Sequence, residues 1–321
     1  MEFLRAEKYD KISSLILHNV ALNSLEGIEI LKDTLIFLDC SANCLRNLKG
    51  LENFTKLKYL DCSSNSLTNV DELKSSTNLK YFDCAVNHIK NLDGIMNAKN
   101  MKWIHIYENH TRDMKWVVNF KKLKMLYAGL NGIKNLDGIE NLQELKCCSI
   151  NENLFMDDET IKLLHLKKLV TLYIGRYDIE LTNIKFAKYL RNLRYLYVTS
   201  PALQNLNGIE NCEKLEKVEI FRSKKLSIFP NLLKLKRLRH LMLYNSPIIS
   251  HKGLPENITF YHDKFDVYCP MEAEPYVTID LHEVSGIRKF LNISENTKHL
   301  KISWFSWIGD KNIINKLYEF F

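Results

Sequence analysis

The sequence of 321 residues has little of what separates domains or anchors a chain in a membrane. It contains 11 glycines and 6 prolines, too few for several domains joined by flexible linkers. No run of apolar residues exceeds four, whereas a membrane-spanning helix needs about 20 and a secretory signal about 7 to 15. We therefore expect a soluble protein that stays in the compartment where it is made.

A large excess of charge is also absent. Lysine and arginine number 45 against 38 aspartates and glutamates, which leaves a net charge of +7. This mild excess does not by itself indicate a nucleic-acid partner. Apolar residues make up 46% of the chain and charged residues 26%, a balance that excludes intrinsic disorder and is typical of a folded globular protein.

The sequence does contain a repeat with a period of 22 residues. The segment Leu57–Leu67 follows the pattern L-x-x-L-x-(L/C)-x-x-N-x-L, and the same frame begins at Leu35, Leu79, Met101, Leu123 and Leu145. We number the motif so that its first leucine is position one and its asparagine position nine. The frame continues more loosely in the next four units, whose position-six residues are Ile174, Val198, Ile220 and Leu243. It extends upstream to Leu17 and downstream to Phe260, Leu281 and Ile302, which gives about fourteen units.

The pattern predicts one strand in each unit, because its apolar residues alternate along the chain as a strand buried on one face requires. The asparagine suits a tight turn, since its side chain can satisfy backbone groups that a corner leaves unpaired. The remaining residues return along the outer side as a short helical or 3₁₀ segment. One unit cannot bury its apolar face alone, so stacked units share a core. The sequence therefore predicts an α/β solenoid that curves with its parallel strands on the concave side.

These residues resemble the leucine-rich repeat family. The segments Leu92-Asp-Gly-Ile95, Leu136-Asp-Gly-Ile139 and Leu206-Asn-Gly-Ile209 are most similar to the 22-residue subclass found in internalins and in Sds22-type phosphatase regulators. The resemblance covers about residues 12–305. It implies a horseshoe-shaped fold with a parallel sheet on the concave face and 3₁₀ segments on the convex face, but it leaves the binding partner open.

The ends of a solenoid must be covered, so we divide the chain into three parts. Residues 1–14 are expected to form an N-terminal cap, residues 15–253 the leucine-rich repeats, and residues 254–321 divergent repeats with a C-terminal cap. In the last part, a helix beginning at Asp310 is expected to close a final strand at His299–Ser303. The asparagine column also ends after Asn153, which predicts less regular packing beyond it.

The outward positions of the strands carry many aromatic side chains. Nine of the 15 tyrosines lie there, and tyrosine, tryptophan and arginine dominate binding hot spots. A structural explanation stays open, because aromatic residues also favour strands and pair across them. We expect these rings to project into solvent, so that their replacement leaves stability nearly unchanged. The predicted partner-binding residues are Phe37, Asp39, Tyr59, Asp61, Tyr81, Asp83, Trp103, His105, Tyr107, Tyr127, Tyr173, Arg176, Tyr195, Tyr197, Phe221, Arg222 and Tyr244.

Charge on this predicted surface is uneven along the chain. Asp39, Asp61 and Asp83 lie in the N-terminal half, and Arg176 and Arg222 in the other. Like charges on neighbouring strands repel one another, and a basic partner would relieve that repulsion. An explanation that needs no partner stays open as well, since aspartate at this position is common in the repeat family.

The cysteines predict a reducing compartment rather than a metal site. Cys40, Cys62 and Cys84 take positions that leucine or isoleucine fills elsewhere, and free cysteine packs as a small buried hydrophobe. Only Cys40 and Cys44 approach the spacing of zinc ligands, and they flank a turn. We expect no metal and no cofactor, and we expect a cytoplasmic protein, of the source cell or of an infected host cell.

No catalytic motif is present, so we expect no enzymatic activity. The favoured function is a protein–protein interaction module that binds a protein partner on its concave, aromatic-rich face, with a monomer favoured. One alternative is a nucleic-acid binder that uses the lysines at position two, although a solvated rim is the simpler interpretation. Another is the substrate-recognition subunit of a ubiquitin ligase. The position-two lysines are Lys58, Lys80, Lys102, Lys124 and Lys146.

Overall fold

The computed structural model describes residues 12–178, 181–227, 229–246, 253–255 and 258–263, and the strands 277–280 and 299–302. The chain divides into two compact units, Met1–Val267 and Tyr268–Phe321. Each unit is described by itself below. The predicted N-terminal cap falls almost wholly on residues 1–11, which lie outside the described residues.

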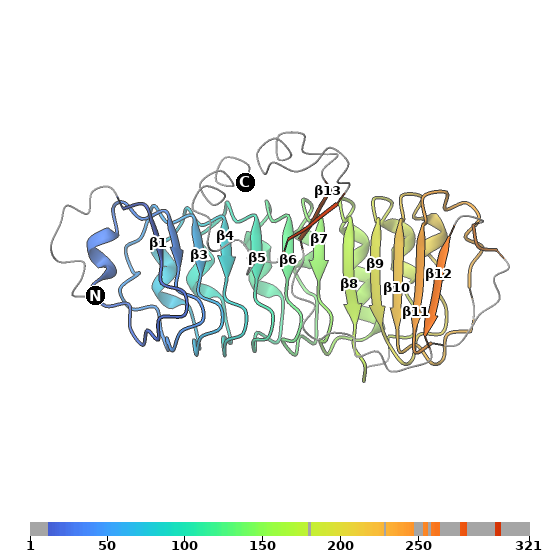
Figure 1. Ribbon diagram of the computed structural model, residues 1–321, viewed down its shortest axis with the longest axis horizontal. Helices are drawn as coiled ribbons and strands as arrows, with labels where there is room; N and C mark the ends of the chain where they lie inside the picture. The colour runs from blue at the N-terminus through green and yellow to red at the C-terminus, as the bar shows by residue number, and fades with distance from the viewer. Residues whose placement is uncertain are drawn as a thin grey trace. The chain divides into compact units, whose positions relative to one another are not determined.

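The first unit is built on a parallel sheet of twelve strands whose order in space is their order in the chain (Figure 1). This single-file order confirms the predicted solenoid. The strands are β1 (Ser14–Ile16), β2 (Phe37–Asp39), β3 (Tyr59–Asp61), β4 (Tyr81–Asp83), β5 (Trp103–His105), β6 (Met125–Tyr127), β7 (Cys147–Ser149), β8 (Thr171–Gly175), β9 (Tyr195–Thr199), β10 (Lys217–Phe221), β11 (His240–Tyr244) and β12 (Thr259–Asp263).

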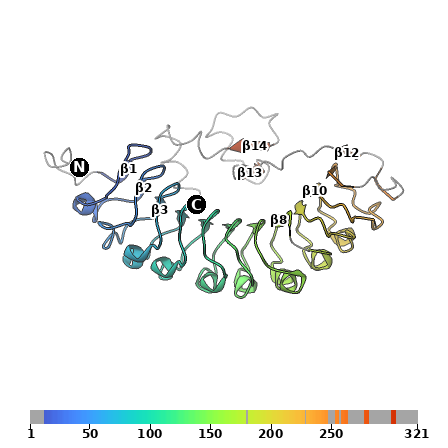
Figure 2. The ribbon, with the colours of Figure 1, turned by 90° about the horizontal axis from the view of Figure 1, so that it is seen from below.

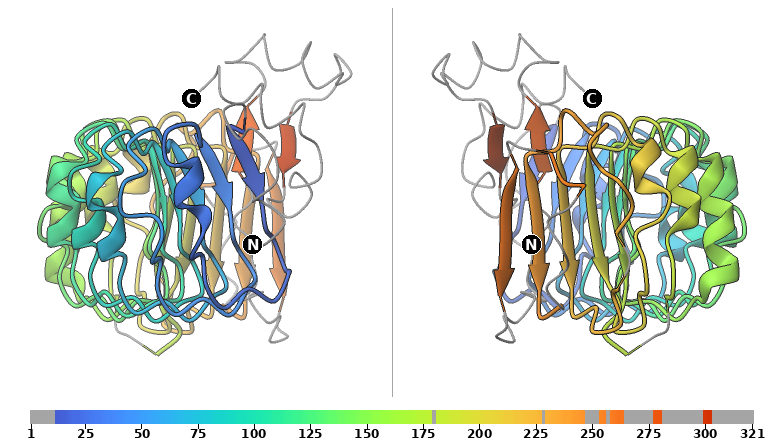
Figure 3. Two further views of the ribbon diagram at one scale, coloured as in Figure 1. Left: turned by 90° about the vertical axis from the view of Figure 1, so that its left-hand side faces the viewer. Right: turned by 90° about the vertical axis from the view of Figure 1, so that its right-hand side faces the viewer.

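Short 3₁₀ helices return the chain along the other side, as the sequence predicts. Seen along the strands, the strands line the inner side of a curve and the helices its outer side (Figure 2), and views from the two ends of the stack separate the two layers (Figure 3). The curve follows because strands pack about 4.8 Å apart while the outer segments need more room. The helices are η2 (Ile28–Leu31), η3 (Asp71–Ser75), η4 (Asp93–Ile95), η5 (Lys115–Asn119), η6 (Ile139–Asn141), η7 (Asp157–His165), η8 (Lys185–Tyr189) and η9 (Ile209–Asn211).

The core lies between these two layers and consists of columns of like residues. Leu57, Leu60 and Cys62, at positions one, four and six, are fully buried, and so are their counterparts in the neighbouring repeats. The predicted inward column of Cys40, Cys62 and Cys84 is confirmed. The thiols of Cys40 and Cys62 donate to the backbone carbonyls of Asp61 and Asp83 at 3.4 and 3.3 Å. One strand therefore binds the next through the core as well as through its backbone.

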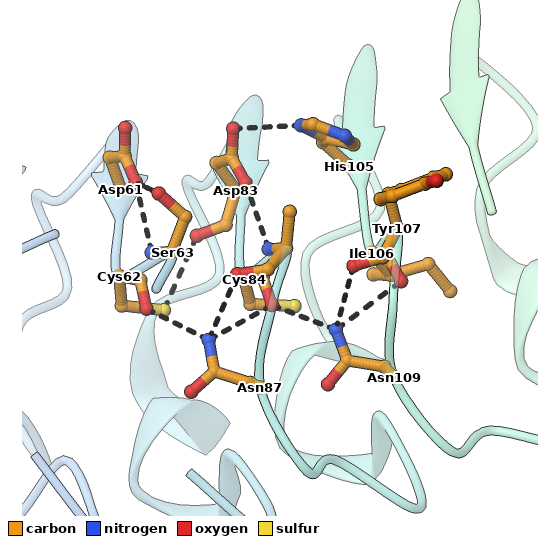
Figure 4. Close-up of polar contacts among 11 residues, drawn as sticks. Asp61, Cys62, Ser63, Asp83, Cys84, Asn87, His105, Ile106, Tyr107 and Asn109 are labelled. Carbon is orange, nitrogen blue, oxygen red and sulfur yellow. Dashed lines mark hydrogen bonds and ion pairs between the residues drawn. The ribbon is translucent and has the colours of Figure 1, made fainter. Parts of the chain in front are cut away.

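The position-nine asparagines join consecutive repeats in the way the sequence predicts. The Asn87 amide donates to the carbonyls of Cys84 and Ala85 in its own turn and to Cys62 in the preceding repeat, at 3.1 to 3.2 Å (Figure 4). Its Oδ1 accepts the N–H of Leu67 at 2.8 Å. Each buried asparagine thus satisfies backbone groups that the corner leaves unpaired.

The sheet changes where this asparagine column ends. Strands β1 to β7 have three residues each, whereas β8 to β12 have five. In the repeats with asparagine, the residue before it has a left-handed backbone, as Val86 does with a φ of 55°. Arg222 and Asn245, which follow two of the longer strands at the same position, share this conformation. The longer strands therefore coincide with the loss of the asparagine and not with the loss of that turn, and the predicted loss of regularity appears as a longer strand.

The glycine of the Leu-Asp-Gly-Ile segments has a steric explanation at Gly94. A Cβ atom there would lie 1.7 Å from the carbonyl oxygen of Val70 in the preceding repeat. The close approach lets η4 pack directly on η3, so the signal that suggested the 22-residue subclass reflects contact between adjacent repeats.

The C-terminal part of the chain differs from the expected repeats in where the parallel sheet ends and in how the last two strands pair. The parallel sheet runs to Asp263, past the predicted end of the regular repeats at residue 253. The extension of the repeat frame to Leu281 and Ile302 is wrong, because β13 (Val277–Asp280) and β14 (His299–Ile302) pair antiparallel in a sheet of their own. Parallel repeats cannot place consecutive strands in that orientation. The predicted helix at Asp310 lies outside the described residues.

We predict that Asn87→Ala lowers the free energy of unfolding by about 3 kcal/mol, because it leaves buried backbone groups in two repeats without partners. Urea denaturation followed by circular dichroism measures this. Asn53→Ala, at an exposed site, serves as the control and should change stability by less than about 0.5 kcal/mol. Equal losses in both variants would contradict the role assigned to the asparagine column.

Candidate functional site

The concave face, defined as the outward side chains of β2 to β11, carries a row of aromatic rings at position three. Parallel pairing places Phe37, Tyr59, Tyr81 and Trp103 directly opposite one another on β2 to β5. Neighbouring ring centroids are 6.5, 6.1 and 3.9 Å apart along the row. The Tyr81 and Trp103 planes differ by 11°, which is a stacked arrangement. The four rings form one continuous surface.

The predicted side of the sheet is correct for these rings, but their predicted exposure is wrong. Tyr59 and Trp103 are 8% and 6% exposed, and Tyr127 is 5% exposed. They lie apart from the leucine core, because they alternate with its residues along each strand. A strand spacing of about 4.8 Å brings equivalent rings into contact and removes much of their surface from solvent. Because the rings are buried, the expectation that their replacement leaves stability unchanged no longer holds.

A second row, at position five, is acidic and ends on a histidine. Asp61 accepts hydrogen bonds from the backbone N–H and the hydroxyl of Ser63 at 3.0 and 2.7 Å. Asp83 accepts from the N–H of Ala85 at 2.9 Å, and its other oxygen lies 3.0 Å from Nδ1 of His105 (Figure 4). Asp39 accepts the same two hydrogen bonds from Ser41, one from its backbone N–H and one from its hydroxyl. The predicted residues Asp39, Asp83 and His105 are buried rather than solvent-exposed.

The carboxylates of the acidic row repel one another. Burial, and then the charges of Asp83 and Asp39, raise the pKa of Asp61 well above its usual range. His105 lies next to Asp83, at the C-terminal end of the row, where it can offset part of this negative charge. The predicted repulsion between neighbouring aspartates is therefore present, and local hydrogen bonds offset it in part.

The four rings at position three of β2 to β5 form the first aromatic cluster. Smaller side chains separate it from a second aromatic cluster. Met125, Cys147 and Thr171 take position three on β6 to β8. Here the Cys147 thiol lies 3.6 Å from the Tyr127 hydroxyl, and burial raises the pKa of Cys147 to about 11. A thiol with so high a pKa is protonated at neutral pH and is a poor nucleophile.

The second aromatic cluster lies on β8 to β11 and is less buried. Tyr173 and Tyr197 stack with centroids 4.1 Å apart and planes within 4°. Phe221 and Tyr244 stack at 4.7 Å and 8°. Lys217 forms an ion pair with Glu219 at 2.6 Å and lies 5.6 Å from the centre of the Tyr197 ring. The rings of this second cluster are half-buried.

At the predicted basic end of the concave face, two arginines pair with acidic neighbours that sequence reasoning missed. Arg176 forms an ion pair with Asp178. The Tyr195 hydroxyl donates to Glu216 at 3.1 Å, and Arg194 binds the same carboxylate at 2.8 Å. The two contacts with Glu216 join positions two and three of one repeat to position two of the next, so aligning the repeats by position would have revealed them. Tyr107 and Arg222, the other predicted residues, are half-buried at positions seven and eight.

Glu152 is a further group that the sequence did not single out. It occupies position eight with a left-handed backbone, near Arg176 and Arg222. Burial raises its pKa from an ordinary value of 4.5 to about 7, and the two arginines oppose this only in part.

Among the described residues, no group of histidine, cysteine, aspartate and glutamate has an arrangement that could hold a metal ion. Within the same part of the chain, no helix has the length and apolar character to span a membrane. The seven cysteines described are all free thiols, and five of them are buried.

We predict that Trp103→Ala lowers the free energy of unfolding by about 3 kcal/mol, because it removes a large buried ring that stacks on Tyr81. Urea denaturation provides the measurement. Tyr177→Ala is the control, since that ring is 46% exposed. If the two variants lose the same stability, the concave rings do not support the fold.

We also predict that the stability contributed by Glu152 falls as pH rises from about 4.5 to about 7. The folded protein retains this proton to a higher pH than the unfolded chain, so deprotonation favours unfolding. Glu152→Gln should match the parent protein at pH 4 and exceed its stability by about 1 kcal/mol at pH 8, a modest value because the side chain is partly exposed. Thermal melts across this range test it, with exposed Glu213→Gln as the control. A difference that does not grow with pH would contradict the assignment.

Comparisons with known proteins agree with this geometry. A model described as leucine-rich repeats in two copies matches residues 33–75. No curated protein sequence matches the chain. An internalin from Listeria monocytogenes has a similar solved structure, with a TM-score of 0.63 and 21% identity over 79% of this chain and 81% of that one.

Two further structures share the fold. Internalin C2 of the same organism aligns at a TM-score of 0.50 and 24% identity, over 66% of this chain and 82% of that one. The Arabidopsis receptor kinase HAESA, solved with a peptide hormone and a co-receptor, aligns at 0.58 and 16%, over 79% of this chain and 46% of that one. The described repeats, the matching family model and these structures together show that the chain carries leucine-rich repeats folded into a solenoid like that of the internalins.

Proposed function

We propose that this protein is a non-enzymatic interaction module whose concave face binds a protein partner. The observation that carries the proposal is the gathering of stacked aromatic rings on one side of the sheet, apart from the core. Large rings held rigid by their neighbours lose little conformational entropy on binding, which is why aromatic residues dominate hot spots.

The dimensions of the sheet support a protein-sized partner. Twelve parallel strands spaced about 4.8 Å apart give an inner surface roughly 50 Å long. That length accommodates a standard interface of about 800 Å² per partner. HAESA was solved in complex with a peptide hormone, so a solenoid of this fold can hold a protein ligand.

Within the concave face, the Tyr173–Tyr197 pair is the best candidate anchor. Both rings are half-buried, so they present surface to a partner while their stacking holds them in place. Lys217 and Glu219 flank the pair and supply polar contacts beside it. This arrangement of a rigid apolar centre with a polar border is typical of protein interfaces.

The protonated state of the Cys147 thiol argues against a cysteine-based enzyme at the concave face. Cys269 lies outside the described residues. The predicted ubiquitin-ligase role would thus be limited to recognition of a substrate.

We further propose that the protein works in a reducing compartment, the cytoplasm of its own cell or of an infected host cell. The exposed thiol of Cys44 and the buried thiols of the core support this, since free cysteines persist where glutathione keeps them reduced.

We predict that Tyr173→Ala combined with Tyr197→Ala weakens capture of the natural partner at least tenfold, because it removes the anchor from the concave face. The purified protein is used as bait in an extract of the source cell, and a captured protein is identified and then titrated by calorimetry. The control combines Met156→Ala and Ile161→Ala, which replace side chains 50% and 55% exposed in and beside η7. Undiminished binding by the tyrosine variant, with an unchanged melting temperature, would contradict a concave site.

A further inference from the structure

A row of five lysines runs beside the first aromatic cluster and takes part in none of the ion pairs formed by the described residues. Lys58, Lys80, Lys102, Lys124 and Lys146 occupy position two in five consecutive repeats, immediately before β3 to β7. We call these residues the lysine row. Lys58, Lys80 and Lys102 are half-buried, and Lys124 and Lys146 are exposed.

Backbone hydrogen bonds hold the lysine row in a straight line. The N–H of Lys80 donates to the carbonyl of Lys58 at 2.9 Å, and each later lysine donates to the one before it at 2.8 Å. Successive lysines are therefore one strand spacing apart, about 4.8 Å at the backbone. Burial, and then the nearby charges of Lys124 and Lys80, lower the pKa of Lys102.

No member of this row forms an ion pair within the described residues, although Glu144, which is paired with Lys168, lies close enough to feel the charges of Lys124 and Lys146. Among the described residues, ion pairs form at Lys74, Lys162, Lys168 and Lys217, and none forms at a member of the lysine row. The row also has clear ends, because Ile36 precedes it and Val170 follows it at position two. Beyond Val170 the same position carries Arg194, which is paired with Glu216. Position two then carries Glu216 and Arg239, so the unbroken run of lysines is limited to the five repeats of β3 to β7.

Two neighbouring rows indicate which anion fits. The acidic row, with Asp61 and Asp83, lies three residues further along the same strands, about 10 Å away. Any anion bound at the lysine row must therefore keep to a narrow strip at the start of the strands. Single-stranded nucleic acids also bind by stacking bases on open aromatic faces, whereas Tyr81 and Trp103 are already stacked on each other at 3.9 Å. An extended acidic segment needs no stacking and can follow that strip.

We propose that the lysine row binds an acidic segment of the protein partner, a run of aspartates or glutamates in extended conformation that crosses β3 to β7. The inference rests on the proposed function and adds the chemistry of the partner to it. The carboxylates of the segment would supply counter-charges to lysines that form no ion pair with the described residues. The partner's remaining surface would then lie against the concave face.

The test measures binding of a fluorescein-labelled octapeptide of glutamate by fluorescence anisotropy in 20 mM salt. The matched probes are an octapeptide of glycine and serine and a twelve-nucleotide oligothymidine. We expect the glutamate peptide to bind more tightly than either, and its affinity to fall steeply as salt is raised.

Two triple variants with the same change in net charge separate a specific site from general attraction. Lys80→Gln, Lys102→Gln and Lys124→Gln together should weaken peptide binding at least tenfold. Lys49→Gln, Lys224→Gln and Lys225→Gln, all at exposed sites, should change it less than twofold. The proposal is overturned by equal losses in the two variants, by tighter binding of the oligothymidine, or by failure of the glutamate peptide to bind at all.

Titration of the natural partner against the same variants separates this inference from the proposed function. If the lysine-row variant keeps full affinity for the partner while the Tyr173 and Tyr197 variant loses it, only the acidic-segment inference fails. If the tyrosine variant keeps full affinity, the concave site itself fails.

Discussion

The structure depends on one constraint, the register in which each repeat stacks on the preceding one. Hydrogen bonds from parallel strands and from the asparagine column align residues that are 22 positions apart in the chain. Any residue type that recurs at one position therefore becomes a row of touching neighbours. Leucine forms the core in this way, aromatic residues form a stack, and aspartate and lysine form lines of like charge.

Each row on the concave face reflects a compromise between folding and binding. Rings one strand apart bury one another, which stabilises the sheet and fixes the shape that a partner would meet. Like charges one strand apart repel, which costs stability. The chain offsets that repulsion at Asp83 with His105 and at Asp61 with Ser63, whereas no member of the lysine row forms an ion pair within the described residues. A regular array of like charge costs stability, so the lysine row does not by itself support the fold.

The fold could be predicted from the sequence because one pattern recurs in every repeat. That pattern determines the local structure of each repeat and also the way in which the repeats stack. The alternation of Leu57, Leu60 and Cys62 determined the buried face, and Asn87 and its counterparts identified the corner. The repeat frame failed where its signal was weakest: Leu281 and Ile302 preserved the spacing by coincidence, and the strands there pair antiparallel. The side of the sheet on which Tyr59 and Trp103 lie followed from alternation alone.

Their burial did not follow from it, because exposure depends on how closely neighbouring rings approach and on which rotamers they adopt. The ion pair of Arg194 with Glu216 was missed for a related reason, since the two residues come together only when repeats are aligned position by position. The lengthening of the strands after Asn153 was likewise not predicted, because strand length depends on backbone hydrogen bonding, which the hydrophobic pattern does not report.

The most direct test of the stacked register is a nuclear Overhauser measurement on deuterated protein with protonated aromatic rings and methyl groups. The account predicts strong contacts between the rings of Tyr81 and Trp103 and between those of Tyr173 and Tyr197, each pair separated by one repeat. Strong contacts from these rings to the buried leucine methyl groups, in place of the ring–ring contacts, would contradict it.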